Sequence, residues 1–297
     1  MTGSPPRAMT SGMAAELIDG KTIAKRVRGE VKARVEAMVA DKGIAPHLVV
    51  VLASDDPASA VYVRNKGKAA AEVGIRSTQH TLDPGTSAEE LLALIEKLNA
   101  DDDIDGILVQ LPLPKHHDTE AVIRAIHPAK DVDGLHPENA GKLSRGDEHC
   151  LIPCTPRGSI RLIEEAGTKL EGKSAVVIGR SRLVGRPVAD LLLNRNATVT
   201  VCHSRTKHLA DVVKSAEVVI AAVGREAFVE GEWIQEGATV IDVGINRNAA
   251  GKLCGDVDFE VAKNYAGAIT PVPGGVGPMT IAYLLDNTVT AAQWRRA

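Results

Sequence analysis

Ser174-Ala-Val-Val-Ile-Gly-Arg-Ser-Arg-Leu-Val-Gly-Arg-Pro187 is the stretch that decides how the second half of this chain folds. The apolar run 175–178 predicts a buried strand, Gly179 ends it, and the apolar-periodic segment 184–193 predicts a helix. Strand, glycine turn and helix in this order direct the helix N-terminus at a phosphate, as in a dinucleotide site. The spacing from Gly179 to Gly185 departs from Gly-x-Gly-x-x-Gly, so a plain strand–helix turn stays an alternative.

The next predicted strand, 198–202, indicates which dinucleotide the site prefers. In an NAD site such a strand usually ends in an acidic residue that binds the ribose 2′-hydroxyl. Here the strand runs into His203-Ser204-Arg205-Thr206, with no carboxylate. A carboxylate would repel a 2′-phosphate, whereas arginine and serine side chains bind one. We therefore expect NADP as the cofactor.

Composition restricts the class of protein. The chain has 297 residues, of which 44% are apolar and 25% charged, as in a soluble globular protein with two domains. A net charge of −3 suggests neither a nucleic-acid nor a membrane partner. The cysteines at 150, 154, 202 and 254 lack the further ligands of a zinc site and indicate reduced thiols in the cytoplasm. Residues 1–13 read as a disordered tail, a late start site or a cloning remnant, not a signal peptide.

The order of predicted elements gives two α/β units. In residues 14–155, buried strand runs at 47–53 and 104–109 and a weaker strand at 75–82 alternate with helical segments, which predicts a parallel sheet with right-handed crossovers. Periodicity then fades, and 130–155 reads as loops. Residues 156–278 form a Rossmann-type unit with further strands at 217–222 and 239–243. We expect the last helix, within 279–297, to return to the first unit.

The fold class is therefore α/β with two domains. Ligands of such sheets bind beyond the carboxyl ends of the strands, so we expect the active site in the cleft between the units. Tyr62 and Lys66 are four residues apart on a predicted helix, which puts them on one face. A lysine partly buried beside an aromatic ring loses hydration, and its pKa falls. A core tyrosine and a solvated lysine are the alternative on spacing alone.

Polar residues elsewhere are further candidates. Gln110 ends the predicted strand 104–109 and precedes Leu111-Pro112, so it either contacts a ligand or caps the strand. In Lys130-Asp-Val-Asp-Gly134, a carboxylate such as Asp133 could accept paired hydrogen bonds from a heterocycle edge, although two turn-forming aspartates explain the pattern as well. His116-His117 has no evident third ligand, so we expect no metal site.

The segment Thr270-Pro-Val-Pro-Gly-Gly-Val-Gly-Pro-Met-Thr280 is rich in both proline and glycine and opens a helix. A stiff loop with exposed backbone N–H groups beside a helix N-terminus favours a binding role over an ordinary surface loop.

Together these motifs resemble the bifunctional methylenetetrahydrofolate dehydrogenase/methenyltetrahydrofolate cyclohydrolase family, from about residue 15 to 289. The matching text is Tyr62-x-x-x-Lys66-x-Lys68-Ala-Ala, Gly106-Ile-Leu-Val-Gln-Leu-Pro-Leu-Pro114, Lys130-Asp-Val-Asp-Gly-Leu135, Pro153-Cys-Thr-Pro156, Gly179-Arg-Ser-x-x-Val-Gly-x-Pro187 and the 270–280 loop. The resemblance implies NADP-dependent oxidation of 5,10-methylenetetrahydrofolate to the methenyl form, hydrolysis to 10-formyltetrahydrofolate, a cytoplasmic location and a homodimer.

The resemblance also implies roles for single residues. Lys66 is the main catalytic group, tuned by Gln110; Tyr62 stacks on the folate ring and Asp133 holds the pterin. The folate site is further lined by Leu111, Pro112, Pro273, Gly274, Gly275 and Gly277. Cofactor contacts fall on Gly179, Arg180, Ser181, Ser204, Arg205 and Ile245.

Two other classes of protein remain as alternatives. A two-domain NADP-dependent oxidoreductase of amino or hydroxy acids would have no use for Tyr62 or the 273–278 loop. A non-catalytic nucleotide-binding or scaffold protein would bind NADP without turnover.

Overall fold

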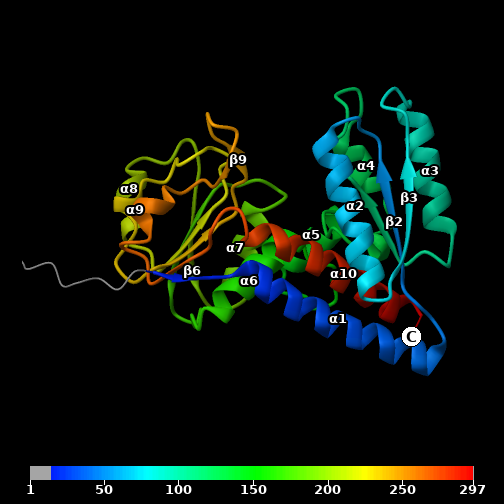
Figure 1. Ribbon diagram of the computed structural model, residues 1–297, viewed down its shortest axis with the longest axis horizontal. Helices are drawn as coiled ribbons and strands as arrows, with labels where there is room; N and C mark the ends of the chain where they lie inside the picture. Colours follow the sequence, from blue (N-terminus) through cyan, green and yellow to red (C-terminus); the bar gives the residue numbers. More distant parts are fainter. Residues whose placement is uncertain (1–14, 297) are drawn as a thin grey trace, which may run out of the picture.

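The computed structural model describes residues 15–296, and the tail expected at 1–13 lies outside the described residues. Two parallel sheets stand apart in the molecule (Figure 1). The smaller one has the order β3 (Arg76–Thr81), β2 (His47–Leu52) and β4 (Gly106–Val109). The larger one has six parallel strands, in the order β1 (Glu16–Leu17), β11 (Ala268–Ile269), β8 (Thr239–Asp242), β7 (Val218–Ala221), β5 (Ser174–Ile178) and β6 (Thr198–Cys202). The predicted α/β class is confirmed.

Helices follow the strands in both units. In the first unit these are α2 (Pro57–Glu72), α3 (Ala88–Ala100) and α4 (Thr119–Ala125). In the second they are α6 (Cys154–Glu165), α7 (Gly185–Leu193), α8 (Leu209–Lys214) and α9 (Phe259–Ala262), with a small hairpin of β9 (Asn246–Arg247) and β10 (Leu253–Cys254). Single turns of 3-10 helix occur at Pro128–Lys130 and Gly231–Trp233.

The prediction that 130–155 consists of loops is wrong. Helix α5 (Pro137–Ser144) lies there, begun by the His136 ring, which accepts the N–H of Glu138 at 3.1 Å. The helix buries only Asn139 and Leu143, so it is too short and too polar to show an apolar period.

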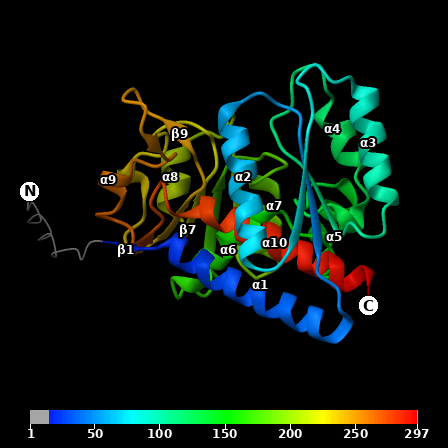
Figure 2. The same ribbon diagram turned by 45° about the vertical axis from the view of Figure 1, so that its right-hand side comes forward.

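Two long helices, α1 (Gly20–Lys42) and α10 (Val276–Arg295), pack against each other and run from beside the larger sheet to beneath the smaller one (Figures 1 and 2). Helix α10 also packs on α6, and Asp286 accepts from Arg34 of α1 at 2.5 Å and pairs with Arg157 of α6 at 2.6 Å. The last helix begins earlier than the predicted 279, because the end of the 270–280 loop is already helical. This helical layer joins the two sheets.

The first strand of the described chain, β1, pairs with β11 in the six-stranded sheet, although α1 and β2 follow it in sequence. The division at residue 155 stays a prediction.

Within residues 15–296, no helix combines the length and apolar character needed to cross a membrane.

Candidate active site

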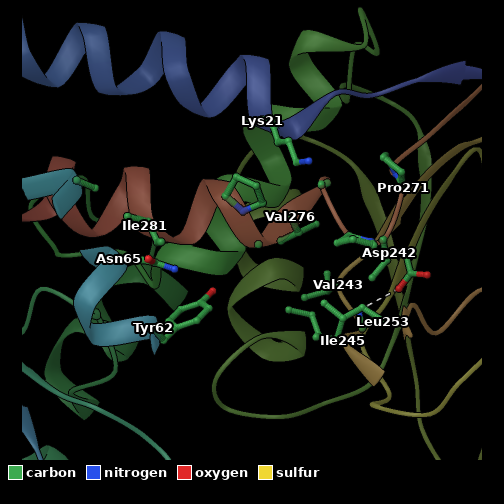
Figure 3. A pocket seen from close by; sticks show the side chains of 18 of the residues that line it. Lys21, Tyr62, Asn65, Asp242, Val243, Ile245, Leu253, Pro271, Val276 and Ile281 are labelled. Carbon is green, nitrogen blue, oxygen red and sulfur yellow. Dashed lines mark hydrogen bonds between the residues drawn. The ribbon is translucent and has the colours of Figure 1, made fainter. Parts of the chain in front are cut away.

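A cavity of about 480 Å³ lies where elements of the two sheets face each other. Its walls are α2, the start of α1, and the loops 243–245 and 271–278. Figure 3 shows Tyr62 reaching from α2 into the space that Lys21, Ile245 and Val276 border. The predicted residues among its lining are Tyr62, Ile245, Pro273, Gly274, Gly275 and Gly277. The structure therefore brings these residues to one cavity.

Lys66 lies one helical turn after Tyr62, on the same face of α2. Helix α2 begins at Pro57, after Asp56, whose carboxylate accepts the N–H groups of Ala58 and Ser59. The Lys66 side chain is only 5% exposed, and its Nζ is 5.2 Å from the centre of the Tyr62 ring. The same Nζ donates to Gln110 Oε1 at 2.8 Å. Gln110 Nε2 donates to the Leu111 carbonyl at 2.6 Å, which turns its oxygen toward the lysine.

Burial is the main cause of the pKa shifts in this site. It lowers the pKa of Lys66, while the Asp133 carboxylate opposes this. Burial likewise raises the pKa of Asp133, opposed by Lys66 and by a hydrogen bond from Cys154. Desolvation thus favours the neutral forms of both groups over their mutual attraction. The pKa of Tyr62 is also raised, mainly by burial, so Tyr62 remains a phenol at neutral pH.

The two aspartates of the Lys130–Gly134 motif differ in role. Asp131 is buried and accepts the His136 N–H at 2.7 Å and Asn139 Nδ2 at 3.0 Å, so it holds the turn. Burial raises the pKa of Asp131 to about 6. From the other side, Asn287 Nδ2 of α10 donates to the Val132 carbonyl at 2.9 Å. The segment is thereby fixed with Asp133 on the Lys66 side.

Lys130, the first residue of that motif, is structural. Its buried Nζ donates to the carbonyls of Leu98, Asn99 and Asp101 at 3.1, 2.7 and 2.6 Å. These groups lie at the C-terminal end of α3, where backbone carbonyls lack helical partners.

The turn after β5 fits a dinucleotide. Gly179 has φ +124°, and a Cβ there would lie 2.1 Å from the Ala222 carbonyl oxygen. A Cβ at Gly185 would lie 2.2 Å from the Gly179 oxygen, so only glycines permit this approach of strand and helix. A second cavity, of about 330 Å³, opens at this turn and includes Gly179, Arg180, Ser181 and Ser204 in its lining.

The surroundings of this turn also fit NADP. The segment after β6 carries Ser204 and Arg205, both exposed, and no carboxylate. Arg182 pairs with Glu120 at 2.6 Å, whereas Arg180 and Arg205 make no ion pair within residues 15–296. These cations are therefore available to a phosphate.

Several predicted site residues line neither cavity, and several residues that do line a cavity were not predicted. Neither cavity is lined by Lys66, Gln110, Asp133, Leu111, Pro112 or Arg205. Lys66 is connected to the first cavity through the Tyr62 ring, which lies 5.2 Å from its Nζ and lines that cavity. Sequence reasoning did not find Lys21, Asn65 and Asp242 in the first cavity or Arg225 in the second. Of these residues, only Asp242 could have been found from the sequence, because it is a carboxylate at the end of a predicted strand. Burial raises the pKa of Asp242 to about 7, and the neighbouring Asp256 adds to the shift.

Known proteins match both halves of this arrangement. Residues 18–133 match the tetrahydrofolate dehydrogenase/cyclohydrolase catalytic domain, and residues 153–296 match the NAD(P)-binding domain of that family. Bifunctional protein FolD 1/3 of Ruegeria pomeroyi is 57% identical over 282 residues, covering 94% of this chain and 95% of the relative.

Solved structures agree with this. The bifunctional FolD enzyme of Campylobacter jejuni superimposes with a TM-score of 0.92 at 48% identity, covering 95% of this chain and 100% of that one. Trypanosoma brucei FolD, complexed with NADP cofactor and inhibitor, gives 0.90 at 40% identity, covering 96% and 100%. Both the sequence resemblance and the two-sheet architecture are thus confirmed, and the chain belongs to the tetrahydrofolate dehydrogenase/cyclohydrolase family.

Proposed function

We propose that this chain oxidises 5,10-methylenetetrahydrofolate with NADP and hydrolyses the 5,10-methenyltetrahydrofolate formed to 10-formyltetrahydrofolate, both at the cavity beside Tyr62. The observation that carries the proposal is the buried Lys66 amine, which donates to the neutral amide of Gln110 and lies 5.2 Å from the centre of the Tyr62 ring at the wall of the first cavity. The bifunctional relatives support both activities.

For the oxidation, the role of the protein side chains is to position the substrate against the cofactor. The reacting methylene is flanked by two nitrogens whose lone pairs stabilise the resulting cation, so no acid or base is required. NADP, when bound, accepts the hydride. Tyr62 offers an aromatic face to the folate ring, and Asp133 accepts hydrogen bonds from the pterin edge. The 273–277 loop forms part of the cavity wall, and the segment 111–112 supports Lys66 through Gln110, whose Nε2 donates to the Leu111 carbonyl.

For the hydrolysis, Lys66 acts as a general base. Its neutral amine accepts a proton from water as the oxygen bonds to the methenyl carbon, and Gln110 holds the amine in place. The proton then passes to the folate nitrogen, whose bond to that carbon breaks. The hydroxyl group on the carbon loses its remaining proton to solvent as it becomes the carbonyl, which leaves the formyl group on the other nitrogen and releases one proton overall. Burial lowers the pKa of Lys66, which favours the neutral amine that this step requires.

Arg180 supports the cofactor assignment, with Gly179, Ser181, Ser204, Arg205 and Ile245 as further contacts. These residues surround or follow the glycine turn that admits a phosphate, except Ile245, which lies on the β8 side of the cleft.

We further propose a homodimer formed through the larger sheet. Strand β6 is one of the two edge strands of this sheet. Val201 on β6 is 40% exposed, and Leu183 and Leu193, which precede β6 in the chain, are exposed as well. An open edge with exposed apolar side chains favours pairing with a second copy.

We also propose a cytoplasmic location and the division into residues 14–155, completed by the last helix, and residues 156–278. The four cysteines form no disulfide, and three of them are buried. The packing of α10 on α1 supports the assignment of the last helix to the first unit.

Replacement of Lys66 by methionine tests its role as a base. The variant keeps apolar bulk but loses the titratable amine, so hydrolysis of methenyltetrahydrofolate falls by roughly 10²–10⁴, the usual range for general acid–base catalysis. The native rate rises with pH as the amine deprotonates, below the ordinary lysine range, and this rising limb disappears in Lys66→Met. Exposed Arg64 on the same helix provides the control, Arg64→Met, with a native profile. A native rate that falls as the amine deprotonates would exclude the base role.

Replacement of Arg180 by alanine tests the cofactor preference. Loss of a charge-assisted contact to the 2′-phosphate costs about 1.5–3 kcal/mol, which raises the KM for NADP and leaves the weaker use of NAD nearly unchanged. Arg182→Ala, at the neighbouring arginine that already pairs with Glu120, is the control and keeps the preference. Steady-state kinetics with both cofactors give the answer, and equal or better use of NAD by the native enzyme would contradict it.

Replacement of Asp133 by alanine tests the pterin anchor. Folate affinity drops in both reactions, by about 0.5–1.5 kcal/mol for each hydrogen bond to the pterin edge that is lost. NADP titration stays native, because Asp133 lies on the folate side of the cleft, beside Lys66. Folate binding as tight as that of the native enzyme would remove Asp133 from this role.

Replacement of Val201 by lysine tests the dimer. A charge on the open edge of β6 opposes pairing of two copies, so the native protein sediments as a dimer and the variant as a monomer. A native monomer would refute the proposal.

A further inference from the structure

Two buried carboxylates outside the Lys66 site hold the loops around the glycine turn. Asp242 ends β8 and is 3% exposed, and Asp256 follows β10 and is fully buried. Neither forms an ion pair with the residues that the structure describes. A buried carboxylate without a cation needs several hydrogen-bond donors, and these define what the group does.

Asp256 holds the loop after β7. Its Oδ2 accepts the N–H groups of Val223 and Gly224 at 2.6 and 2.9 Å, and its Oδ1 accepts that of Arg225 at 2.9 Å. Oδ1 also accepts Asn246 Nδ2 at 2.9 Å. Three successive backbone N–H groups thus converge on one carboxylate. The loop that they belong to borders the cavity at Gly179 through Val223 and Arg225.

Asp242 holds the loop after its own strand and fixes Asp256. Its Oδ1 accepts the N–H of Gly244 at 2.9 Å, the bond drawn beside Asp242 in Figure 3, and that of Asp256 at 2.9 Å. Its Oδ2 accepts the N–H of Val257 at 2.9 Å. The Asp242 N–H donates to Thr270 Oγ1 at 2.8 Å, at the start of the 270–280 loop.

Two glycines make room for the carboxylates. A Cβ at Gly244 would lie 2.1 Å from Asp256 Oδ1, and one at Gly255 would lie 1.9 Å from Asp242 Oδ2. Neither glycine has a positive φ, so space and not backbone conformation requires glycine at these positions. The glycines are independent evidence that the sequence is adapted to this close packing of the two carboxylates on the backbone.

We infer that Asp242 and Asp256 are positioning residues for hydride transfer. Together they fix loops 223–225 and 243–246, which border the two cavities from the side of the larger sheet. This role rests on the proposed function, since it presumes NADP at the glycine turn and folate beside Tyr62.

The two activities depend differently on these loops. Hydride transfer needs the reacting atoms about 3–3.5 Å apart, and a displacement of about 1 Å costs roughly 10²-fold in rate. Hydrolysis uses Lys66 and Gln110, which lie on α2 and after β4, in the unit of the smaller sheet. Loosening of the carboxylate-bound loops should therefore reduce oxidation and spare hydrolysis.

Asp256→Asn provides the first test. Both oxygens of Asp256 accept hydrogen bonds only from N–H donors, so an amide nitrogen at either position faces donors and releases part of the loop. We expect kcat for oxidation to fall roughly 10–10²-fold, with cyclohydrolase kinetics native. Hydrogen exchange of the amides of 223–225 should accelerate.

Gly244→Ala reaches the same contact without any change in charge, because its methyl group displaces the Asp256 carboxylate. It should reproduce the selective loss of oxidation. Glu217→Gln is the control: this carboxylate also accepts a backbone N–H, from Ser174 at 3.1 Å, but at the opposite end of the sheet. It should keep the native ratio of the two activities.

Three outcomes would count against the inference. Oxidation at the native rate in both variants would overturn the positioning role and leave the proposed function intact. An equal loss of oxidation and hydrolysis, with a lower melting temperature, would show a purely structural role. Absence of oxidation in the native enzyme would refute the proposed function, and the positioning role with it.

Discussion

The packing of α10 between α1 and α6 is the constraint on which the rest of the structure depends. Helix α10 buries residues on all its sides, so it forms a core shared by both units. Asp286 lies between arginines of its two neighbours, and Asn287 bonds the carbonyls of Val132 and Ile152. A Cβ at Gly20, the first residue of α1, would lie 1.8 Å from the Gly275 oxygen, so α1 and the 270–280 loop meet without side chains between them. The distance between Lys66 and the cofactor loops is therefore set by helix packing and not by flexible linkers.

Within that frame, the partner of Lys66 determines its chemistry. A carboxylate at position 110 would stabilise the ammonium and keep the lysine charged, whereas the neutral amide of Gln110 orients the amine and adds no charge. Asp133 is the one carboxylate whose field raises the pKa of Lys66, and burial outweighs it. The site thus holds a lysine and an aspartate near each other while disfavouring the charged form of each.

Much of this arrangement could be predicted from sequence, for identifiable reasons. Strands β2, β4 and β5 are continuous apolar runs because both faces of their sheets are covered, and Tyr62 and Lys66 meet because a helix repeats every 3.6 residues. Short polar elements such as α5 leave no such pattern. Long-range hydrogen bonds leave no such pattern either. The sequence Lys130-Asp-Val-Asp-Gly134 does not show that Lys130 binds the end of α3, or that Asp131 holds a turn while Asp133 lies beside Lys66. Asp256 is the extreme case, because its partners are backbone N–H groups, which every sequence contains.

The two reactions place opposite demands on one site, and a single physical effect reconciles them. Oxidation produces a cation and requires that water be kept away from the hydride, whereas hydrolysis requires one water to be deprotonated beside that same cation. A charged lysine next to the methenyl carbon would raise the energy of the cation and could not accept a proton. Burial lowers the pKa of Lys66 and so favours its neutral form, which in the proposed mechanism relieves the repulsion in the first step and supplies the base in the second.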